Sequence, residues 1–542
     1  MTGFRFRVPV SVFVLALALR AAAAEADTYP RQPGVDAVHY VFRLTLGDAS
    51  DEIAGQTTVT LKLAANVTEA FLDLASAAGG KGMAVSAVTI GGKPVDFAHR
   101  SDRLRIPLTP SPRAGTEILV TVQYSGVPAQ GLRLINNIHG ERTVFSDSWP
   151  NLARQWLPTI DHPYDKATGE LIVTAPAHYQ VVANGVLQEE LDLPGGVRRT
   201  HWKQSVPIAS WLFALGAARF AVHHYDVVRG VPQQVWAFPQ DRDKAYGLFE
   251  LTGRRAFEFF SDSVGPYSYE KLAHVQAAGM SGGMELASSI FYGEKNVTAG
   301  RAPVVHEVAH QWFGNAVTEK DWDDVWLSEG FATYFTHLYA EQFSGRDEFV
   351  RGLKNDIQRI VEAQKQLPDQ PIIHRNISDM STVLNQLVYQ KAGWVLHMLR
   401  AAMGTEKFWT GIREYYKRYR NLNASTDDFR QVMEQAAGTD LAWFFDQWLR
   451  RPGMPRLTGS WRYDAARRQV LIDLAQSQPG PAYRLPLEVG IPGEKGALRI
   501  ERIELLQPTG QFTIPSDAEP SSVTLDPNTW VLMEPPAFVK RQ

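Results

Sequence analysis

The segment Pro303-Val-Val-His306-Glu307-Val-Ala-His310-Gln-Trp-Phe-Gly314 is the most informative stretch of the chain. Pro303 suits the first turn of a helix and Gly314 suits the position after its end, with no glycine or proline between them. The stretch therefore predicts a helix over 303–313. On such a helix His306 and His310 lie one turn apart on one face, so both imidazoles can hold one metal ion while Glu307 projects toward a bound water.

A third metal ligand is expected further along the chain. A catalytic zinc needs three protein ligands and one position left for water. Because the chain contains no cysteine, the third ligand must be a histidine or a carboxylate. Glu329 fits, since it lies in Trp326-Leu-Ser-Glu329-Gly-Phe-Ala-Thr-Tyr334, which predicts a second helix able to pack against the first. These residues predict one Zn²⁺ per chain, although cobalt or manganese could fill the same ligands.

Length and charge limit the other possibilities. At 542 residues the chain is too long for a single core, and we expect three folded parts. Its 55 basic and 58 acidic side chains give a formal net charge of -3, so no overall field attracts nucleic acid or an anionic membrane. Partners must therefore be inferred from the site, and the oligomeric state is not readable from the sequence.

The N-terminus resembles a signal peptide. Basic residues within 1–7 precede an apolar run over 8–19, and Ala-x-Ala sites end at Ala24 and Ala26. The run is shorter than the roughly 18 to 20 residues that span a bilayer. We therefore expect residues 1–26 to be removed during export to the periplasm or the medium, which would leave no integral membrane span. An uncleaved N-terminal anchor is the alternative.

The pattern of the remaining chain predicts a multidomain α+β fold. Alternating stretches such as Tyr40-Val-Phe-Arg-Leu-Thr-Leu46 predict an antiparallel β domain over 27–222. Helical periodicity follows over 223–452, with predicted helices at 246–262, 303–313, 327–343 and 383–403. Strands return over 453–542, after Arg451-Pro-Gly-Met-Pro455, and predict a small C-terminal β-sandwich.

The stretches His306-Glu-Val-Ala-His-Gln-Trp-Phe-Gly-Asn315 and Trp326-Leu-Ser-Glu-Gly-Phe-Ala332 together resemble the zinc signature of the aminopeptidase N family of gluzincin metallopeptidases, which includes leukotriene A hydrolase. The resemblance extends to Ala153-Arg-Gln-Trp-Leu-Pro158 and Phe444-Phe-Asp-Gln-Trp448, so it covers essentially the whole mature chain. It implies a β-saddle domain over 27–222, a thermolysin-like, mainly helical catalytic domain over 223–452 and a β-sandwich over 453–542.

The resemblance also implies a zinc-dependent aminopeptidase that acts on peptides with a free N-terminus. Zinc lowers the pKa of a bound water toward about 7, and Glu307 would then act as the general base. Tyr389 lies in Val388-Tyr389-Gln-Lys-Ala-Gly393, which resembles the family's Tyr-x-Lys-Gly segment, although the glycine falls one place later. By that resemblance Tyr389 would stabilise the oxyanion that develops on the scissile carbonyl.

Substrate recognition is implied for the stretch Gly282-Gly283-Met284-Glu285-Leu286, which resembles the family's Gly-x-Met-Glu-Asn motif. Glu285 would pair with the α-ammonium of the substrate. Gly282, Gly283 and Met284 would form an extended edge along the substrate backbone. Leu286 stands where the family has asparagine, a departure that bears on the backbone contacts and the residue preference.

Other polar residues near these motifs are weaker candidates. The family often adds a second amine-binding residue from the first domain, and Asp147 is the polar residue nearest that position. Polar residues behind the ligands could orient them, and the candidates are Gln311, Asn315, Asp323 and Asp324.

Two other functions remain open at this point. One is a zinc hydrolase of non-peptide substrates, as leukotriene A hydrolase is in opening an epoxide. The other is a catalytically silent exported binding protein with the same fold. The aminopeptidase is favoured because the three ligands and Glu307 are all present, which a silent scaffold does not require.

Overall fold

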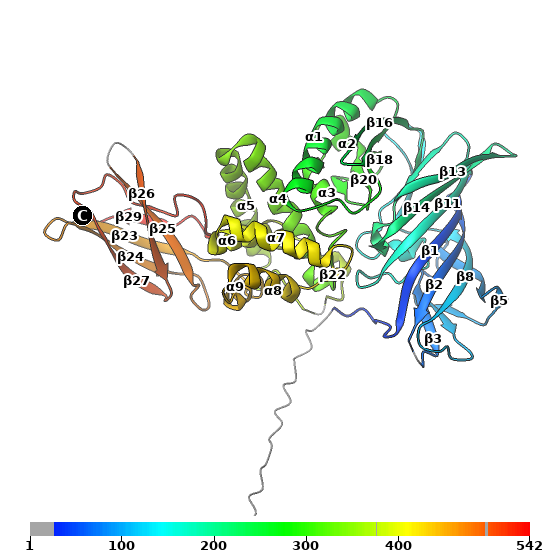
Figure 1. The fold of residues 1–542 in the computed structure, drawn as a ribbon, viewed down its shortest axis with the longest axis horizontal. Helices are drawn as coiled ribbons and strands as arrows, with labels where there is room; N and C mark the ends of the chain where they lie inside the picture. The colour runs from blue at the N-terminus through cyan, green and yellow to red at the C-terminus, as the bar shows by residue number, and fades with distance from the viewer. Residues whose placement is uncertain (1–26, 65, 376, 494–496, 542) are drawn as a thin grey trace, which may run out of the picture.

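The structure is a computed structural model that describes residues 27–541 except positions 65, 376 and 494–496. Three parts follow one another along its long axis: a β-rich N-terminal part, a central helical part and a small C-terminal β part (Figure 1). This arrangement confirms the predicted multidomain α+β fold. The expected leader over 1–26 lies outside the described residues. Within the described ranges, no helix has the length and apolarity needed to cross a membrane.

The N-terminal part is built on an eight-stranded sheet in the order β13-β14-β11-β1-β2-β8-β4-β5. β1 and β11 are parallel, and the other neighbours are antiparallel. Buried and half-buried residues alternate along β11, as expected of a strand with one face on a core. The strands are β1 (Val35–Thr45), β2 (Ile53–Leu63), β4 (Gly82–Ile90), β5 (Lys93–Pro94), β8 (Thr116–Val127), β11 (Lys166–Pro176), β13 (Val186–Leu193) and β14 (Val197–Ala209).

Two smaller sheets complete this part, in the orders β12-β15-β10-β9 and β3-β7-β6. The first of them packs toward the helical part, where the ring centroids of Phe145 and Phe291 are 5.5 Å apart. Their strands are β3 (Glu69–Asp73), β6 (Ala98–Arg100), β7 (Arg103–Pro107), β9 (Leu132–Asn136), β10 (Arg142–Ser146), β12 (Gln180–Ala183) and β15 (Leu215–Ala218).

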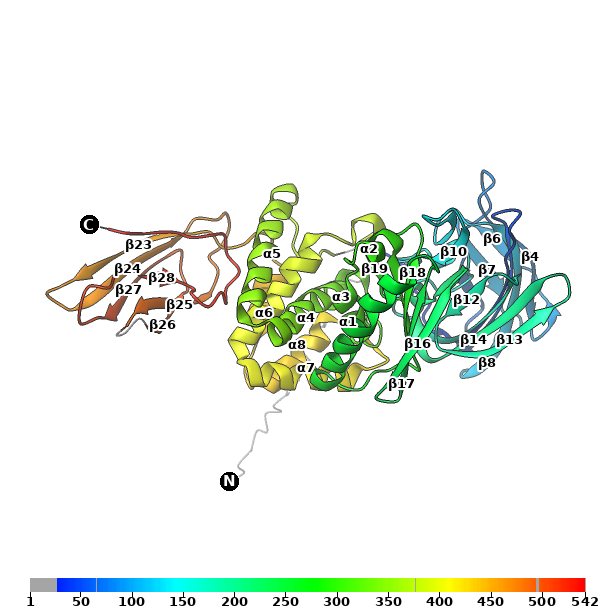
Figure 2. The same ribbon diagram turned by 90° about the horizontal axis from the view of Figure 1, so that it is seen from above.

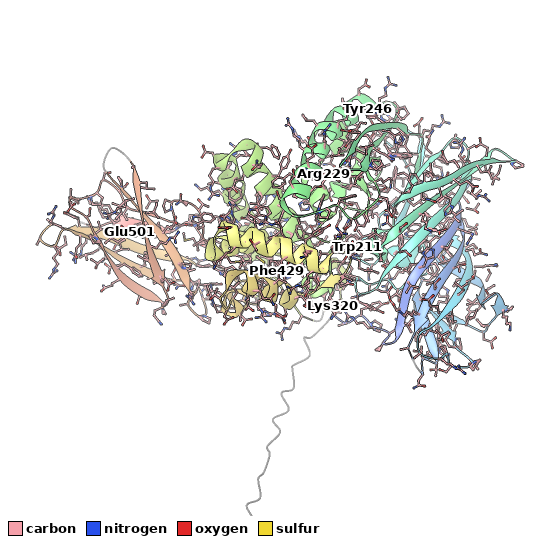
Figure 3. The ribbon with its side chains drawn as sticks, in the orientation of Figure 1. Trp211, Arg229, Tyr246, Lys320, Phe429 and Glu501 are labelled. Atoms are coloured by element: carbon pink, nitrogen blue, oxygen red, sulfur yellow. The ribbon has the colours of Figure 1, made fainter. Side chains whose placement is uncertain are left out.

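A row of three tryptophans joins the N-terminal part to the helical part. The ring of Trp149, in the loop after β10, lies 5.0 Å from the ring of Trp211 and 4.5 Å from that of Trp322, measured between centroids. Trp211 is fully buried and is labelled at the junction of the two parts in Figure 3. Trp322 lies in the helical part, just ahead of the segment with Glu329. The row therefore ties the two parts together next to the predicted metal site.

The central part begins with a five-stranded sheet in the order β16-β17-β18-β20-β19. Every residue of β18 is buried, and the short strand β19 forms one edge by pairing antiparallel with β20. The edge strand contains Gly283 and Met284, so the predicted extended edge is an edge strand. The strands are β16 (Ala221–Val228), β17 (Val231–Ala237), β18 (Leu272–Ala277), β19 (Gly283–Met284) and β20 (Ser289–Gly293).

Helices make up most of the central part (Figure 2). The predicted helix at 246–262 is α1, and that at 327–343 is α4, whose first ten residues are buried. The helices are α1 (Arg242–Ser263), α2 (Glu294–Thr298), α3 (Val304–His310), α4 (Trp326–Ser344), α5 (Arg346–Gln366), α6 (Ala392–Met403), α7 (Thr405–Tyr419), α8 (Thr426–Ala437) and α9 (Ala442–Leu449), with the strand pair β21 (Thr318–Glu319) and β22 (Asn423–Ala424) between them.

Two of the predicted helices differ from the structure. The helix expected over 303–313 ends at His310, because the chain then turns so that the amide of Gly314 donates to the carbonyl of Val317. Gly314 has φ 109°, and a Cβ there would overlap the hydroxyl of Ser328 on α4. The helix expected over 383–403 starts with a π-helical turn, Leu387–Lys391, and continues as α6.

The C-terminal part consists of two sheets, in the orders β27-β24-β23-β29 and β26-β25-β28. The ammonium of Lys391 donates to the carbonyl of Gly453 at 2.8 Å, which fastens the connection between this part and the helices. The strands are β23 (Leu457–Asp464), β24 (Gln469–Gln476), β25 (Leu485–Pro492), β26 (Leu498–Leu505), β27 (Thr509–Pro515), β28 (Thr524–Leu525) and β29 (Ala537–Lys540).

Candidate functional site

The three predicted metal ligands converge between α3 and α4. The Nε2 atoms of His306 and His310 are 3.1 Å apart, and Oε2 of Glu329 lies 3.4 and 3.3 Å from them. A tetrahedral zinc with ligand bonds of about 2.0–2.2 Å needs ligand atoms separated by about 3.3–3.6 Å. Oε2 of Glu329 is buried and accepts no hydrogen bond within the described residues. The donor atoms and their spacing therefore fit a divalent cation.

Neighbouring groups orient these ligands. Nδ1 of His310 lies 3.2 Å from the carbonyl oxygen of Phe313 and 3.1 Å from the hydroxyl of Ser328. A proton on Nδ1, donated to that carbonyl, leaves the lone pair of Nε2 directed at the metal position. The close approach at Gly314 thus brings Ser328 of α4 next to the imidazole of α3.

The charges of the site favour a cation. Burial lowers the pKa of His310, but the carboxylates of Glu285 and Glu329 outweigh it and raise this pKa to about 10. Burial opposes ionisation of Glu329, yet the positive charge of His310 and the closeness of both imidazoles lower its pKa to about 2. The site thus attracts positive charge, either as protons on His310 and the carboxyl groups or as a divalent cation.

Glu307 lies beside the ligands rather than among them. Its carboxylate, the carboxylate of Glu285 and the imidazole of His310 have ligand atoms within 4.8 Å of one another. A Cβ on Gly283 would overlap the carboxylate of Glu307, so glycine at this position leaves room for it. Burial, followed by the charge of Glu285, raises the pKa of Glu307 well above its usual value. A carboxylate with a raised pKa is suited to accept and return a proton.

Glu285 follows directly after the edge strand β19. Its side chain is 4 % exposed, and Oε1 has no hydrogen-bond partner within the described residues. Burial raises the pKa of this carboxyl to about 7. The backbone carbonyl of Glu285 accepts hydrogen bonds from the side-chain amides of Gln311, at 2.8 Å, and Asn315, at 2.6 Å. Two of the four candidates for orienting the ligands, Gln311 and Asn315, therefore position Glu285.

The other two such candidates lie in the loop ahead of α4. Oδ1 of Asp324 accepts a hydrogen bond from the hydroxyl of Thr426 at 2.6 Å, and Oδ1 of Asp323 accepts one from the amide of Ile377 at 3.3 Å. These bonds hold the loop against its neighbours. Leu286, which replaces the family's asparagine, is fully buried in the core. It therefore contributes packing at this position.

Tyr389 reaches the site from the π-helical turn. Its hydroxyl donates to Oε1 of Glu329 at 2.9 Å, and its ring is stacked 6.1 Å from that of His306. Burial, followed by the charge of Glu329, raises the pKa of Tyr389 well above its usual value, so the hydroxyl keeps its proton. Ala392 takes the place of the family's glycine and packs on Gly330 of α4, where a Cβ would be 2.6 Å from that of Ala392. The shifted glycine is thus accommodated by close helix packing.

The site opens into a cavity of about 480 Å³ between the N-terminal and central parts. The central part supplies the ligands, Glu285, Glu307 and Tyr389, with Met280 and Leu384 on the wall. The N-terminal part supplies Arg133, Asp147 and Trp149, of which only Asp147 was a candidate from the sequence. Arg133 lies on β9, far from any motif, so no sequence signal identifies it.

The chain matches two protein-family models and is similar to several known proteins. Residues 250–448 match the Peptidase family M1 domain, and residues 36–212 match the Peptidase M1 N-terminal domain. Glutamyl aminopeptidase of Bos taurus is 29% identical over 353 residues, which are 60% of this chain and 36% of that protein. The Homo sapiens glutamyl aminopeptidase is 28% identical over 416 residues, 71% of this chain and 42% of that protein. The chain thus spans about two fifths of the length of these relatives.

Solved structures of similar fold include Legionella pneumophila aminopeptidase A in complex with aspartic acid, with a TM-score of 0.80. That match has 17% identity and covers 96% of this chain and 61% of the other. The M1 zinc metallopeptidase of Deinococcus radiodurans has a TM-score of 0.66 and 24% identity, and covers 78% of this chain and 95% of the other. At these identities the matches establish the fold.

Proposed function

We propose that this chain, which belongs to peptidase family M1, is a zinc-dependent aminopeptidase that removes the N-terminal residue from peptides. One observation carries the proposal: Glu285, buried and with a free carboxylate oxygen, lies beside a His306, His310 and Glu329 cluster of zinc-like spacing. A metal next to an amine-binding carboxylate places cleavage at the first peptide bond. The names of the relatives, glutamyl aminopeptidase and aminopeptidase A, agree with this class of reaction.

His306, His310 and Glu329 are proposed to hold one zinc ion. Two imidazoles and a carboxylate are a common ligand set of catalytic zinc. When bound, zinc supplies a Lewis acid that polarises the scissile carbonyl and makes water more acidic. Tyr389 holds Glu329 through its hydroxyl, and Phe313 and Ser328 hold His310. Two of the three ligands are thus held in place before the metal binds.

Glu307 is proposed as the general base. Its raised pKa suits a group that takes a proton from the attacking water and later delivers it to the leaving nitrogen. Its carboxylate lies against Gly283 of the edge strand, and therefore next to the expected position of the substrate backbone. Glutamine at this position would keep the shape and remove the proton transfer.

Glu285 and Tyr389 are proposed to bind the two polar ends of the reacting residue. The free Oε1 of Glu285 would accept a hydrogen bond from the α-ammonium, which leaves no room for an acylated amine. The hydroxyl of Tyr389 would turn from Glu329 to the carbonyl oxygen as negative charge develops there. Gly282, Gly283 and Met284 would align the backbone along the sheet edge.

The test is hydrolysis of aminoacyl-p-nitroanilides and of their N-acetylated forms, by wild type, Glu307→Gln and Glu285→Gln. We expect cleavage of the free amines alone, lost with chelator and restored by zinc. Glu307→Gln should lose about 10²- to 10⁴-fold in kcat while it keeps one zinc per chain. Equal cleavage of acetylated substrates would remove Glu285 as the amine anchor. No turnover with zinc bound would instead favour the silent binding protein or a non-peptide substrate.

We also infer that residues 1–26 direct export and that the domains are 27–222, 223–452 and 453–542. The basic start, the apolar run and the Ala-x-Ala sites support the leader. N-terminal sequencing of the exported protein would test it: a chain that starts at residue 25 or 27 agrees with cleavage, and an intact Met1 argues for an anchor.

A further inference from the structure

Arg133 brings a positive charge to a wall of the cavity that is otherwise acidic. The ionisable residues on this wall besides the histidines and Tyr389 are Asp147, Glu285, Glu307 and Glu329, all carboxylates. Among the described residues that line the cavity, Arg133 is the one arginine or lysine. Apart from the proposed metal ion, this guanidinium is therefore the group on the cavity wall that would attract a substrate carboxylate.

Asp147 holds the guanidinium in one orientation. Nε of Arg133 donates to Oδ2 of Asp147 at 3.1 Å, and Nη2 donates to the same oxygen. The amide of Asp147 in turn donates to the carbonyl of Gly131 at 2.8 Å, so the carboxylate follows the β9–β10 hairpin. Nη1 makes no hydrogen bond within the described residues. Because a guanidinium has five N–H donors, the outer edge of Arg133 can still bind a second carboxylate.

The ion pair is not needed to hold the hairpin together. β9 and β10 already pair through the ladder from Arg142 with Asn136 to Ser146 with Leu132. The side chain of Arg133 is 44% exposed, so a ligand in the cavity can contact it. Arg142, on the same hairpin, is paired with Asp51 and does not line the cavity. The two arginines thus share a hairpin but face different surroundings.

We propose that Arg133 binds a carboxylate of the peptide substrate, a role that rests on the proposed aminopeptidase function. Glu285, the metal position and Arg133 line one cavity, so a substrate held by the first two has a further carboxylate within the same enclosure as this guanidinium. Two parts of a peptide carry such a carboxylate: an acidic side chain on the first residue and the C-terminus of a short peptide. Asp147 is a positioning residue in this arrangement, since it holds the guanidinium through Nε and Nη2.

The experiment compares four substrates: Glu-p-nitroanilide, Ala-p-nitroanilide, Ala-Ala-Ala and Ala-Ala-Ala-amide. Arg133→Met keeps the aliphatic stem and removes the charge, Arg133→Lys keeps the charge without the paired donors, and Arg142→Met is the matched control. We expect Arg133→Met to lower kcat/KM by about 10-fold or more for the substrate whose carboxylate is bound, and by less than about 3-fold for its uncharged counterpart. Arg133→Lys should recover part of the loss, and Arg142→Met should change none of the four.

The outcomes separate the two sources of carboxylate. A selective loss for Glu-p-nitroanilide assigns the acidic side chain, and a selective loss for Ala-Ala-Ala over its amide assigns the C-terminus. Either result supports the proposal, whereas an equal loss for all four substrates or no loss for any overturns it. Calorimetric titration of glutamate against glutamine, and of Ala-Ala-Ala against its amide, in the Glu307→Gln background measures binding without turnover. Carboxylate-selective binding that Arg133→Met abolishes would support the role of Arg133 even if hydrolysis, and with it the proposed function, failed.

Discussion

Tyr389→Phe separates two tasks that the structure gives to one hydroxyl. In the structure the hydroxyl donates to Oε1 of Glu329 at 2.9 Å, and in the reaction it is proposed to turn to the oxyanion. A hydrogen bond to a charged group contributes about 1.5–3 kcal/mol, so its loss should weaken zinc binding about 10- to 150-fold. Loss of an oxyanion donor costs about 10²- to 10³-fold in kcat, or about 2.7–4 kcal/mol.

The assay is kcat on an aminoacyl-p-nitroanilide, measured across a titration of free zinc. For Tyr389→Phe we expect the half-saturating zinc concentration to rise and kcat to stay about 10²- to 10³-fold low at saturation. Tyr334→Phe is the control, because this buried hydroxyl on α4 pairs with His397 instead of a proposed metal ligand. If saturating zinc returned Tyr389→Phe to within about 3-fold of wild type, the hydroxyl would serve Glu329 alone and the oxyanion role would be wrong.

Two further predictions concern stability. Burial lowers the pKa of Lys391 to about 7. Between this pH and the pKa of Lys391 in the unfolded chain, the unfolded chain binds a proton that the folded protein does not. The free energy of unfolding therefore rises with pH in this window. Lys391→Met should reduce this rise by up to about 1.4 kcal/mol per pH unit in urea unfolding between pH 7 and 9, and an unchanged slope would contradict the shift. Gly330→Ala should destabilise the protein by about 1–3 kcal/mol, because its Cβ would lie 2.6 Å from that of Ala392; an unchanged urea midpoint would show that α4 and α6 can separate at little cost.

The parts of the site that could be predicted from the sequence are those fixed by local geometry. His306 and His310 meet because residues one turn apart on a helix share a face, whatever surrounds them. Glu329 could be placed because its own helix begins just before it. The end of α3 could not, because the turn at Gly314 depends on Ser328 approaching from α4.

Residues that the tertiary fold brings to the site could not be predicted from the sequence. Arg133 and Trp149 enter the cavity from a sheet of the N-terminal part, and neither lies in a motif or in a periodic pattern that faces the metal. The π-helical turn that presents Tyr389 also could not be predicted, since the helical periodicity of a sequence does not distinguish one widened turn from a regular one. The β domains, in contrast, followed from alternation along single strands such as β11, because one face of each sheet is buried.

The tryptophan row offers an optical signal of how the protein is assembled. Indole rings as close as those of Trp149, Trp211 and Trp322 interact electronically, and their fixed mutual tilt gives a coupled circular dichroism band in the far ultraviolet that separated rings do not give. Because Trp149 also lines the cavity, a ligand there would perturb the same band. Docking of the N-terminal part onto the helices, and occupation of the cavity between them, can therefore be followed without a label.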